Sequence, residues 1–228
     1  MNLFSLREEE IFKTLKDLRD CNLVIIGGYA VNAYTLPRFS VDCDIVLKDA
    51  KELRKIDKIL LSRGYKPKVA FEDAPYSGSF SRYEKKLENE FMVSMDILIQ
   101  SVVDRMTAVC FSAAWIFQNS ERKTLRGKTI GEELKLKIIN LDALIVMKTI
   151  SCRSTDIRDV FMMLPQAKNE EWIKAEISQR YNFQERVSKL MEKVHSAQFK
   201  DGLFGVYGKF DQKVFEKHQK AVASLQNR

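Results

Sequence analysis

Three aspartates are spaced so that they could do chemistry together. Asp42 and Asp44 lie two positions apart in the run Val41–Leu47, and Asp96 lies in the middle of the apolar run Phe91–Ile99. In an extended strand, residues i and i+2 point to the same face, so the first two carboxylates can converge on a hard cation such as Mg²⁺. A third carboxylate from an adjacent strand would allow two metal ions about 3.5–4 Å apart, the arrangement used for in-line phosphoryl or nucleotidyl transfer.

A pair of glycines precedes these acids. Gly27 and Gly28 follow the short apolar strand predicted at Asn22–Ile26 and precede Tyr29–Leu36, which has the character of a short helix stopped by Pro37. Glycines between a strand and a helix let backbone N–H groups approach a phosphate closely. Alone, a Gly-Gly pair is usually a turn and an Asp-x-Asp usually a solvated strand edge. Their joint occurrence in this order, with a third acid in an apolar strand, favours a phosphate-transfer site.

The elements around these residues alternate between helix and strand up to about residue 100. The near-helical spacing of apolar residues in the first 20 or so positions predicts an amphipathic helix. Val41–Leu47 is predicted as a half-buried strand and Ala50–Arg63 as a helix closed by Gly64. Further strands are expected at Tyr65–Phe71, Ser79–Leu87 and Phe91–Ile99, with a polar loop at Glu72–Gly78. This alternation indicates an α/β or α+β domain with a mixed sheet.

From about Ser101 the pattern is mostly helical, apart from a hairpin expected around Thr124–Ile130 with Gly127 in its turn. The predicted helices are Asn140–Ser151, Asp156–Leu164, Glu170–Tyr181, Gln184–His195 and Phe210–Leu225, with a Gly-containing link at Asp201–Lys209. We therefore expect a catalytic domain over residues 1–105 and a mostly helical domain over residues 106–228.

The order of these motifs resembles a known signature. Gly27-Gly28, a gap of thirteen residues, Asp42-x-Asp44 and a later Asp96 in an apolar strand are similar to the DNA polymerase β-like nucleotidyltransferase superfamily. One branch, the AbiEii-type toxin nucleotidyltransferases and their uncharacterised relatives, is similar in two further strings, Arg38-x-Ser40-x-Asp42-x-Asp44 and Lys148-x4-Arg153-x2-Asp156-x2-Asp159. The resemblance covers about residues 20–165. It implies the nucleotidyltransferase fold, a small mixed sheet flanked by helices and followed by a C-terminal helical domain that closes the nucleotide cleft.

The resemblance also implies roles for the aspartates and glycines. Asp42 and Asp44 would be metal ligands, and Asp96 would be the third ligand and the base for the acceptor hydroxyl. Gly27 and Gly28 would hold the β- and γ-phosphates of a nucleoside triphosphate such as ATP. Two Mg²⁺ ions are the implied cofactors, with Mn²⁺ as an alternative.

Further roles follow from the same resemblance. The superfamily often has Gly-Ser where this chain has Gly-Gly, and there the serine hydroxyl contacts a phosphate. In this chain that contact must come from the backbone or from Ser40. Arg38 and Lys148 would face the triphosphate, although Lys148 could instead extend from an apolar helix to solvent. The remaining residues of the second string would form either a charge network beside the nucleotide or a purely structural ion-pair network: Arg153, Asp156 and Asp159.

The formal charge of +7 suggests a polyanionic partner. A cluster of basic residues around the predicted hairpin could bind along an RNA backbone, or could be an ordinary solvated face: Arg122, Lys123, Arg126, Lys128, Lys135 and Lys137.

With 45% hydrophobic and 30% charged residues, the composition is that of a globular protein and not of a disordered one. The four dispersed cysteines predict free thiols, and no apolar run approaches the roughly 20 residues of a membrane span. We expect a cytoplasmic protein with no membrane partner.

These observations predict a Mg²⁺-dependent nucleotidyltransferase that moves a nucleoside monophosphate from a triphosphate to an acceptor hydroxyl and releases pyrophosphate. The acceptor could be RNA, a protein or a small molecule such as an aminoglycoside. The AbiEii-type resemblance implies the toxin half of a toxin–antitoxin pair, acting on tRNA or another target and partnered by an antitoxin protein. The alternative is a non-catalytic nucleotide-binding or antitoxin-type regulatory protein, against which the complete set of acids argues.

Overall fold

The computed structural model describes residues 3–68, 80–208 and 211–226, and the chain divides into two compact units. The sheet unit comprises Met1–Ala33, Pro37–Val103 and Cys110–Ile139, and the helical unit comprises Tyr34–Leu36, Asp104–Val109 and Asn140–Arg228. This division differs from the one expected at residue 105, because the hairpin near residue 127 belongs with the sheet. The expected loop Glu72–Gly78 lies outside the described residues.

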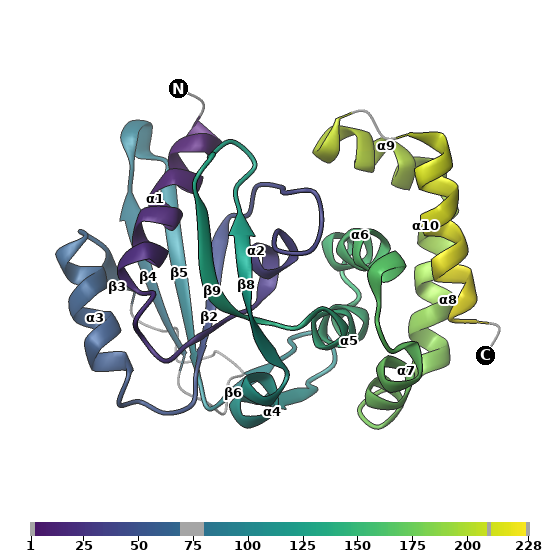
Figure 1. Cartoon of the computed structure of the whole chain (residues 1–228), viewed down its shortest axis with the longest axis horizontal. Helices are drawn as coiled ribbons and strands as arrows, with labels where there is room; N and C mark the ends of the chain where they lie inside the picture. Colours follow the sequence, from purple (N-terminus) through teal and green to yellow (C-terminus); the bar gives the residue numbers. More distant parts are fainter. Residues whose placement is uncertain (1–2, 69–79, 209–210, 227–228) are drawn as a thin grey trace. The chain divides into compact units, whose positions relative to one another are not determined.

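The sheet unit is built on a mixed sheet, as expected, and within the described residues this sheet has seven strands (Figure 1). In spatial order the strands are β3 (Lys66–Lys68), β4 (Phe80–Lys86), β5 (Met92–Ile99), β2 (Asp42–Leu47), β1 (Val24–Ile25), β9 (Glu133–Ile139) and β8 (Ser120–Arg126). The pairs β2–β5 and β1–β9 are parallel, and the other neighbours are antiparallel. A separate pair, β6 (Ser101–Val103) and β7 (Cys110–Ser112), leads into the short helix α4 (Ala113–Gln118).

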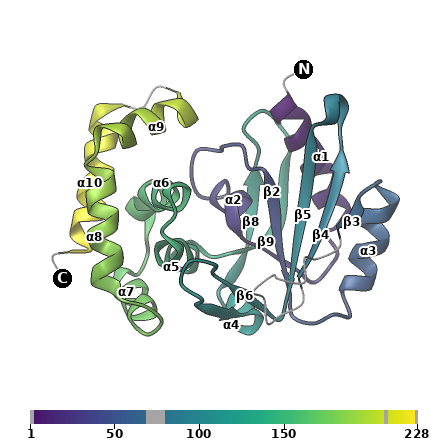
Figure 2. The ribbon, with the colours of Figure 1, turned by 180° about the vertical axis from the view of Figure 1, so that it is seen from behind.

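One face of this sheet, here called the α1 face, is covered by helices α1 (Leu3–Asp17) and α3 (Leu53–Ser62) (Figures 1 and 2). Tyr83 of β4 donates a hydrogen bond to Asp57 of α3, and it lies in register with Met95 and, through Met95, with Cys43. Because side chains alternate along each strand, the residues next to them in sequence point to the opposite face. That second face carries the aspartates and is called the aspartate face.

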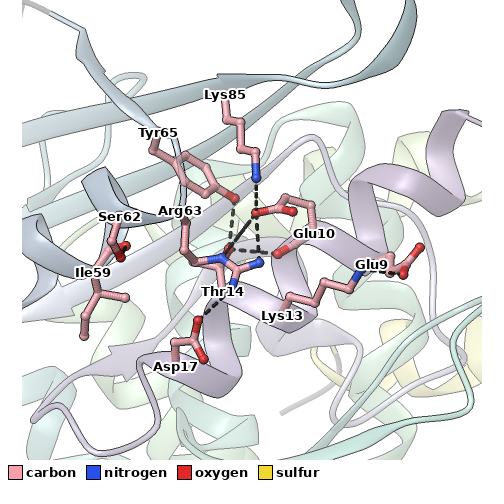
Figure 3. Close-up of polar contacts among 10 residues, drawn as sticks. All are labelled: Glu9, Glu10, Lys13, Thr14, Asp17, Ile59, Ser62, Arg63, Tyr65 and Lys85. Carbon is pink, nitrogen blue, oxygen red and sulfur yellow. Dashed lines mark hydrogen bonds and ion pairs between the residues drawn. The ribbon is translucent and has the colours of Figure 1, made fainter.

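Polar contacts fix α1 on the sheet unit (Figure 3). Arg63, just after α3, forms ion pairs with Glu10 at 3.2 Å and with Asp17 at 2.6 Å. Lys85 of β4 reaches Glu10 at 2.9 Å, and the hydroxyl groups of Thr14 and Tyr65 lie 3.1 Å apart in the buried centre of the group. All these contacts lie on the α1 face. The aspartate face is contacted by other elements, among them the short helix α2 (Gly27–Val31), which packs on β2.

The predicted hairpin is present, but it is longer than expected and belongs to the main sheet. Its strands β8 and β9 flank the turn that contains Gly127, and Ile138 of β9 pairs in parallel with Ile25 of β1. The prediction of a mostly helical region after residue 101 is therefore wrong for β6 and β7, and the hairpin expected around Thr124–Ile130 extends over the whole of β8 and β9. Periodicity detects a hairpin but not the distant strand beside which it pairs.

The helical unit contains α5 (Leu141–Ser151), α6 (Ser154–Met163), α7 (Glu170–Ser178), α8 (Phe183–Val194), α9 (Ala197–Tyr207) and α10 (Gln212–Ser224). The side chain of Asn140 accepts a hydrogen bond from the Ala143 N–H and so caps α5, as the sequence indicates. The expected link at Asp201–Lys209 is wrong, because α9 runs through Gly202 and Gly205 to Tyr207. Ser196 caps α9, and the side chains of Phe199 and Leu203 on this helix are buried. None of the described helices is long and apolar enough to cross a membrane.

Candidate active site

Strands β2 and β5 bring the three aspartates to one face of the sheet. The two strands are parallel neighbours in which Asp44 lies in register with Asp96, and Asp42 lies in register with Ser94. Between the two acids of β2, Cys43 is fully buried on the α1 face. Burial, followed by the charges of Asp44, Asp42 and Asp96, holds the pKa of the Cys43 thiol well above its ordinary value. The negative charges of the aspartates are thus concentrated at one place in the sheet.

Arg82 of β4 is a residue that the sequence analysis did not single out. It lies in register with Asp96 and donates two hydrogen bonds to that carboxylate, from Nε to Oδ1 at 2.7 Å and from Nη2 to Oδ2 at 2.6 Å. Its Nη2 also lies 3.5 Å from Oδ2 of Asp42. These hydrogen bonds raise the pKa of Arg82 further, although burial opposes the shift. Asp96, whose side chain is only 8% exposed, therefore has a charged partner.

The two glycines close one side of this site. Gly27 has a φ of +66°, in the left-handed region that favours glycine, and a Cβ there would overlap Oδ2 of Asp44. A Cβ on Gly28 would overlap Oγ of Ser40. The backbone of the turn therefore passes directly against Asp44 and Ser40.

Asn32, also missed by the sequence analysis, holds the segment of Arg38 in place. Its Nδ2 donates to the Arg38 carbonyl at 2.8 Å, and its Oδ1 accepts from the Arg38 N–H at 3.1 Å. Arg38 is itself buried, and its Nη1 donates to the Phe39 carbonyl. The structure thus gathers Gly28, Arg38 and Ser40 beside one another. A buried asparagine leaves no recognisable sequence signal, because its role depends on a backbone segment that folds back on it.

The oxygen-rich set of three carboxylates fits the ligand preference of Mg²⁺ or Mn²⁺. Among the described residues, however, no three acidic, histidine or cysteine side chains are grouped closely enough to hold a metal ion. The guanidinium of Arg82 lies between Asp96 and Asp42 and takes both oxygens of Asp96. The donor set therefore suits the metal chemically, and a metal that uses Asp96 competes with Arg82 for the same oxygens.

The second predicted string folds into a charge cluster inside the helical unit. The Nζ of Lys148 on α5 lies 2.8 Å from Oδ1 of Asp156 and 2.9 Å from Oδ2 of Asp159, both on α6. Nε of Arg153 donates to Oδ2 of Asp156 at 2.6 Å. Burial alone would raise the pKa of Asp156, but Lys148 and Arg153 more than offset it and lower that pKa to about 2. The geometry is that of a buried ion-pair network, and the expected contact of Lys148 with a triphosphate stays a prediction.

The predicted basic cluster is split by the hairpin. Arg122 and Lys137 lie in register on β8 and β9, and Lys135, two residues before Lys137, lies on the same face. Lys123 points to the opposite face. Arg126 is paired with Glu133 at 2.7 Å. Lys128 lies in the turn, with its Nζ 5.2 Å from the ring centre of Phe39. The six residues do not form one continuous surface.

Comparison with known proteins was informative only at the level of structure. No protein-family model and no curated protein matches the sequence. The crystal structure of JHP933 from Helicobacter pylori has 14% sequence identity and a TM-score of 0.50, over 100% of this chain and 93% of that chain. The crystal structure of a candidate nucleotidyltransferase from H. pylori has 13% identity and a TM-score of 0.52, over 100% of this chain and 96% of that one. At such low identity the likeness is one of fold, and the chain described here has the nucleotidyltransferase fold.

Proposed function

We propose that this chain is a metal-dependent nucleotidyltransferase, which moves a nucleoside monophosphate from a triphosphate to an acceptor hydroxyl. The observation that carries the proposal is the placement of Asp42, Asp44 and Asp96 on one face of parallel neighbours β2 and β5, with Gly27 directly against Asp44. Carboxylates beside a phosphate-binding turn are what a transfer at phosphorus requires. The nucleotidyltransferase fold supports the same assignment.

The triphosphate would be held by backbone and side-chain donors of the sheet unit. The N–H groups at Gly27 and Gly28 would donate to phosphate oxygens, since neither residue has a side chain of its own to hold a phosphate away from the backbone. The Ser40 hydroxyl, packed against Gly28, would supply the contact that a serine in the glycine pair would otherwise make. The buried guanidinium of Arg38 would add positive charge on the same side.

Asp42 and Asp44, joined by Asp96, would hold Mg²⁺ or Mn²⁺, which supplies charge neutralisation and Lewis-acid polarisation at the phosphate when bound. Asp96 would accept the proton of the acceptor hydroxyl. The acceptor oxygen forms a bond to the α-phosphorus, the bond from that phosphorus to the α–β bridging oxygen breaks, and pyrophosphate leaves. Arg82 would have to release at least one oxygen of Asp96 for that carboxylate to take part.

The direct test is transfer of label from each of the four α-labelled nucleoside triphosphates, with Mg²⁺, to RNA, protein and small-molecule fractions of a lysate. Asp44→Asn is expected to lower transfer by at least about a hundredfold, because it removes a metal ligand. Asp49→Asn is the matched control, since Asp49 is exposed just beyond the same strand and is expected to leave transfer unchanged. Equal transfer by Asp44→Asn and wild type would contradict the assignment.

A second function is favoured by one observation, the ion pairs of Arg82 with Asp96 and Asp42. They neutralise the acids without a metal, as a non-catalytic nucleotide-binding or regulatory protein would require. That protein would bind a nucleoside triphosphate equally well in EDTA and in Mg²⁺ and would transfer no label to any fraction. Isothermal titration under the two conditions, beside the transfer assay, distinguishes the two functions.

We further propose that the chain is the toxin of a toxin–antitoxin pair, acting on an acceptor such as tRNA. If the chain is the toxin of a toxin–antitoxin pair, induced expression in a bacterial host will arrest growth, and Asp44→Asn will abolish the arrest while Asp49→Asn will not. Arrest by all three forms would show that growth inhibition does not come from the proposed site.

A further inference from the structure

A cavity of about 290 Å³ lies in the sheet unit, away from the aspartates. It is lined by Arg19, Cys21, Asn22 and Leu23 of the connection from α1 to β1, and by parts of β8 and β9 that include Arg122 and Lys137. Leu23 precedes β1 whereas Gly27 follows it, so the cavity and the candidate active site lie at opposite ends of that strand. The cavity is therefore a separate place on the same unit.

The cavity is strongly basic. Arg19, Arg122 and Lys137 contribute three cations to its lining, against the single acid Glu121. A fourth cation lies close by, because the Nζ atoms of Lys48 and Lys137 lie 5.0 and 4.6 Å from the ring centre of the same residue, Phe117. Two ammonium groups that share one aromatic ring are held near each other.

Arg19 has an exposed partner, Asp20, at 3.7 Å, but the other three cations are not neutralised by any described residue. In the part of the chain that the structure describes, no salt bridge is found for Lys48, Arg122 or Lys137. Burial, followed by the positive charges of Lys48 and Arg122, lowers the pKa of Lys137, as expected where like charges repel. Elsewhere on the hairpin, Arg126 is paired with Glu133. The repulsion at the cavity is a cost that an anionic ligand would relieve.

The chemistry of the lining selects the kind of anion. Arg122 and Lys137 lie directly opposite each other on adjacent strands, so their charges converge from two sides. A guanidinium can bind two oxygens of one phosphate, and an ammonium adds a point charge. Ser120 and Asn22 add further polar groups to the lining. A cavity of this size, close to the lower limit of about 300 Å³ for ligand pockets, accommodates a phosphate group with part of what it is attached to.

We propose that this cavity is a phosphate-binding site, in which Arg122 and Lys137 bind a phosphate group of either a nucleic-acid strand or a small phosphorylated molecule. The proposal does not depend on nucleotide transfer, because it concerns a different end of the sheet. Of the six basic residues predicted around the hairpin, only these two line the cavity.

The test uses the full chain in EDTA, with two probes: a fluorescein-labelled oligouridylate of twelve nucleotides, followed by anisotropy, and inorganic pyrophosphate, followed by isothermal titration. The variant is Arg122→Gln with Lys137→Gln. The matched control is Arg54→Gln with Lys58→Gln, which removes one arginine and one lysine from exposed positions of α3 in the same unit. Thermal melting of both variants checks that they are folded.

Wild type and the control are expected to bind at least one probe, and the cavity variant to bind it roughly tenfold or more weakly. Binding of the oligouridylate alone identifies a strand phosphate as the ligand, and its salt dependence, as log Kd against log salt, should fall by about 1.4 in slope in the cavity variant. Binding of pyrophosphate identifies the small-molecule source. Equal weakening in both variants, or no binding of either probe by wild type, would overturn the proposal. Because Asp44→Asn should retain this binding, its outcome is independent of the transfer assay.

Discussion

Single side chains at the candidate site are constrained by very close neighbours. Asp96 is a buried acid in a mostly apolar strand, and Arg82 makes its burial tolerable by donating to both of its oxygens. Gly27 and Gly28 leave room for Asp44 and Ser40 that no other residue type would leave. At the scale of single residues, the site therefore depends on one pair of hydrogen bonds and on close packing against two glycines.

Gly28→Ala should therefore destabilise the chain, because the new Cβ would overlap Oγ of Ser40. The expected loss in the free energy of unfolding is about 1–3 kcal/mol, measured by urea unfolding. Adding Ser40→Ala removes the overlapping oxygen and should restore part of the loss. Gly131→Ala is the control, since a Cβ at Gly131 meets no atom within 4 Å. Equal effects at positions 28 and 131 would contradict the close packing described here.

Asp156 should make stability depend on pH. Its pKa of about 2 lies below the ordinary 3.8, so the ion pairs stabilise the folded chain above about pH 4, and this contribution is lost as the pH falls through 2. Asp156→Asn should lower the free energy of unfolding by about 2 kcal/mol at pH 7, with a difference that shrinks as the pH approaches 2.

The measurement can be confined to the helical unit. Trp172 lies on α7, whereas Trp115, the other tryptophan, lies on α4 of the sheet unit. In a Trp115→Phe background, the fluorescence of Trp172 therefore follows urea unfolding of the helical unit alone. The exposed Asp201→Asn on α9 serves as the control. A difference between Asp156→Asn and its parent that is the same at pH 7 and pH 2 would refute the ionic explanation.

Between elements, α1 is the part that holds the sheet unit together from its covered face. Besides the contacts to α3 and β4, it fixes the turn of the β8–β9 hairpin through Glu8, which is 1% exposed. Oε1 of Glu8 accepts from the Lys128 N–H at 2.6 Å, and Oε2 accepts from the N–H and the hydroxyl of Thr129, each at 2.8 Å. A helix near the start of the chain thus positions a turn some 120 residues later.

Glu8→Gln should loosen that turn, because the new amide group cannot accept a hydrogen bond where one carboxylate oxygen now does. We expect a loss of about 1–3 kcal/mol in the free energy of unfolding and faster hydrogen exchange at the amides of Lys128 and Thr129. Glu9→Gln is the matched control, since among the described residues the ion-pair partner of Glu9 is the exposed Lys13, one turn later. Unchanged exchange at both amides in Glu8→Gln would show that Glu8 does not hold the turn.

For the whole molecule, the position of the hairpin decides what can fold as a unit. Residues 1–139 contain all the segments of the sheet unit, whereas residues 1–105 lack β8 and β9. Without β9, Ile25 loses its parallel partner Ile138, and the apolar α1 face loses buried leucines at 134 and 136.

A fragment of residues 1–139 should therefore be soluble and melt cooperatively, and a fragment of residues 1–105 should aggregate or show no cooperative transition. Circular dichroism melting and size-exclusion chromatography of the two fragments measure this. Cooperative folding of the shorter fragment would instead support the boundary predicted from the sequence.

The sequence by itself determined the local elements and the residue types of the site. Alternation along β2 predicted that Asp42 and Asp44 share a face, and the Gly-Gly pair predicted the turn beside them, because both signals lie within a few residues of each other. The helix cap at Asn140 was predicted for the same reason, and the mixed sheet was predicted from the alternation of helices and strands along the chain.

Only the tertiary structure decided which distant segments meet. The partners Arg82 for Asp96, Asn32 for Arg38 and Glu8 for the hairpin turn all depend on strand order and packing, which no local pattern encodes. The same holds for the basic cavity, where register places Arg122 opposite Lys137 while Lys123 points away. Periodicity specifies a face for each residue, but the free energy of burying that face is gained only when the neighbouring elements are in place.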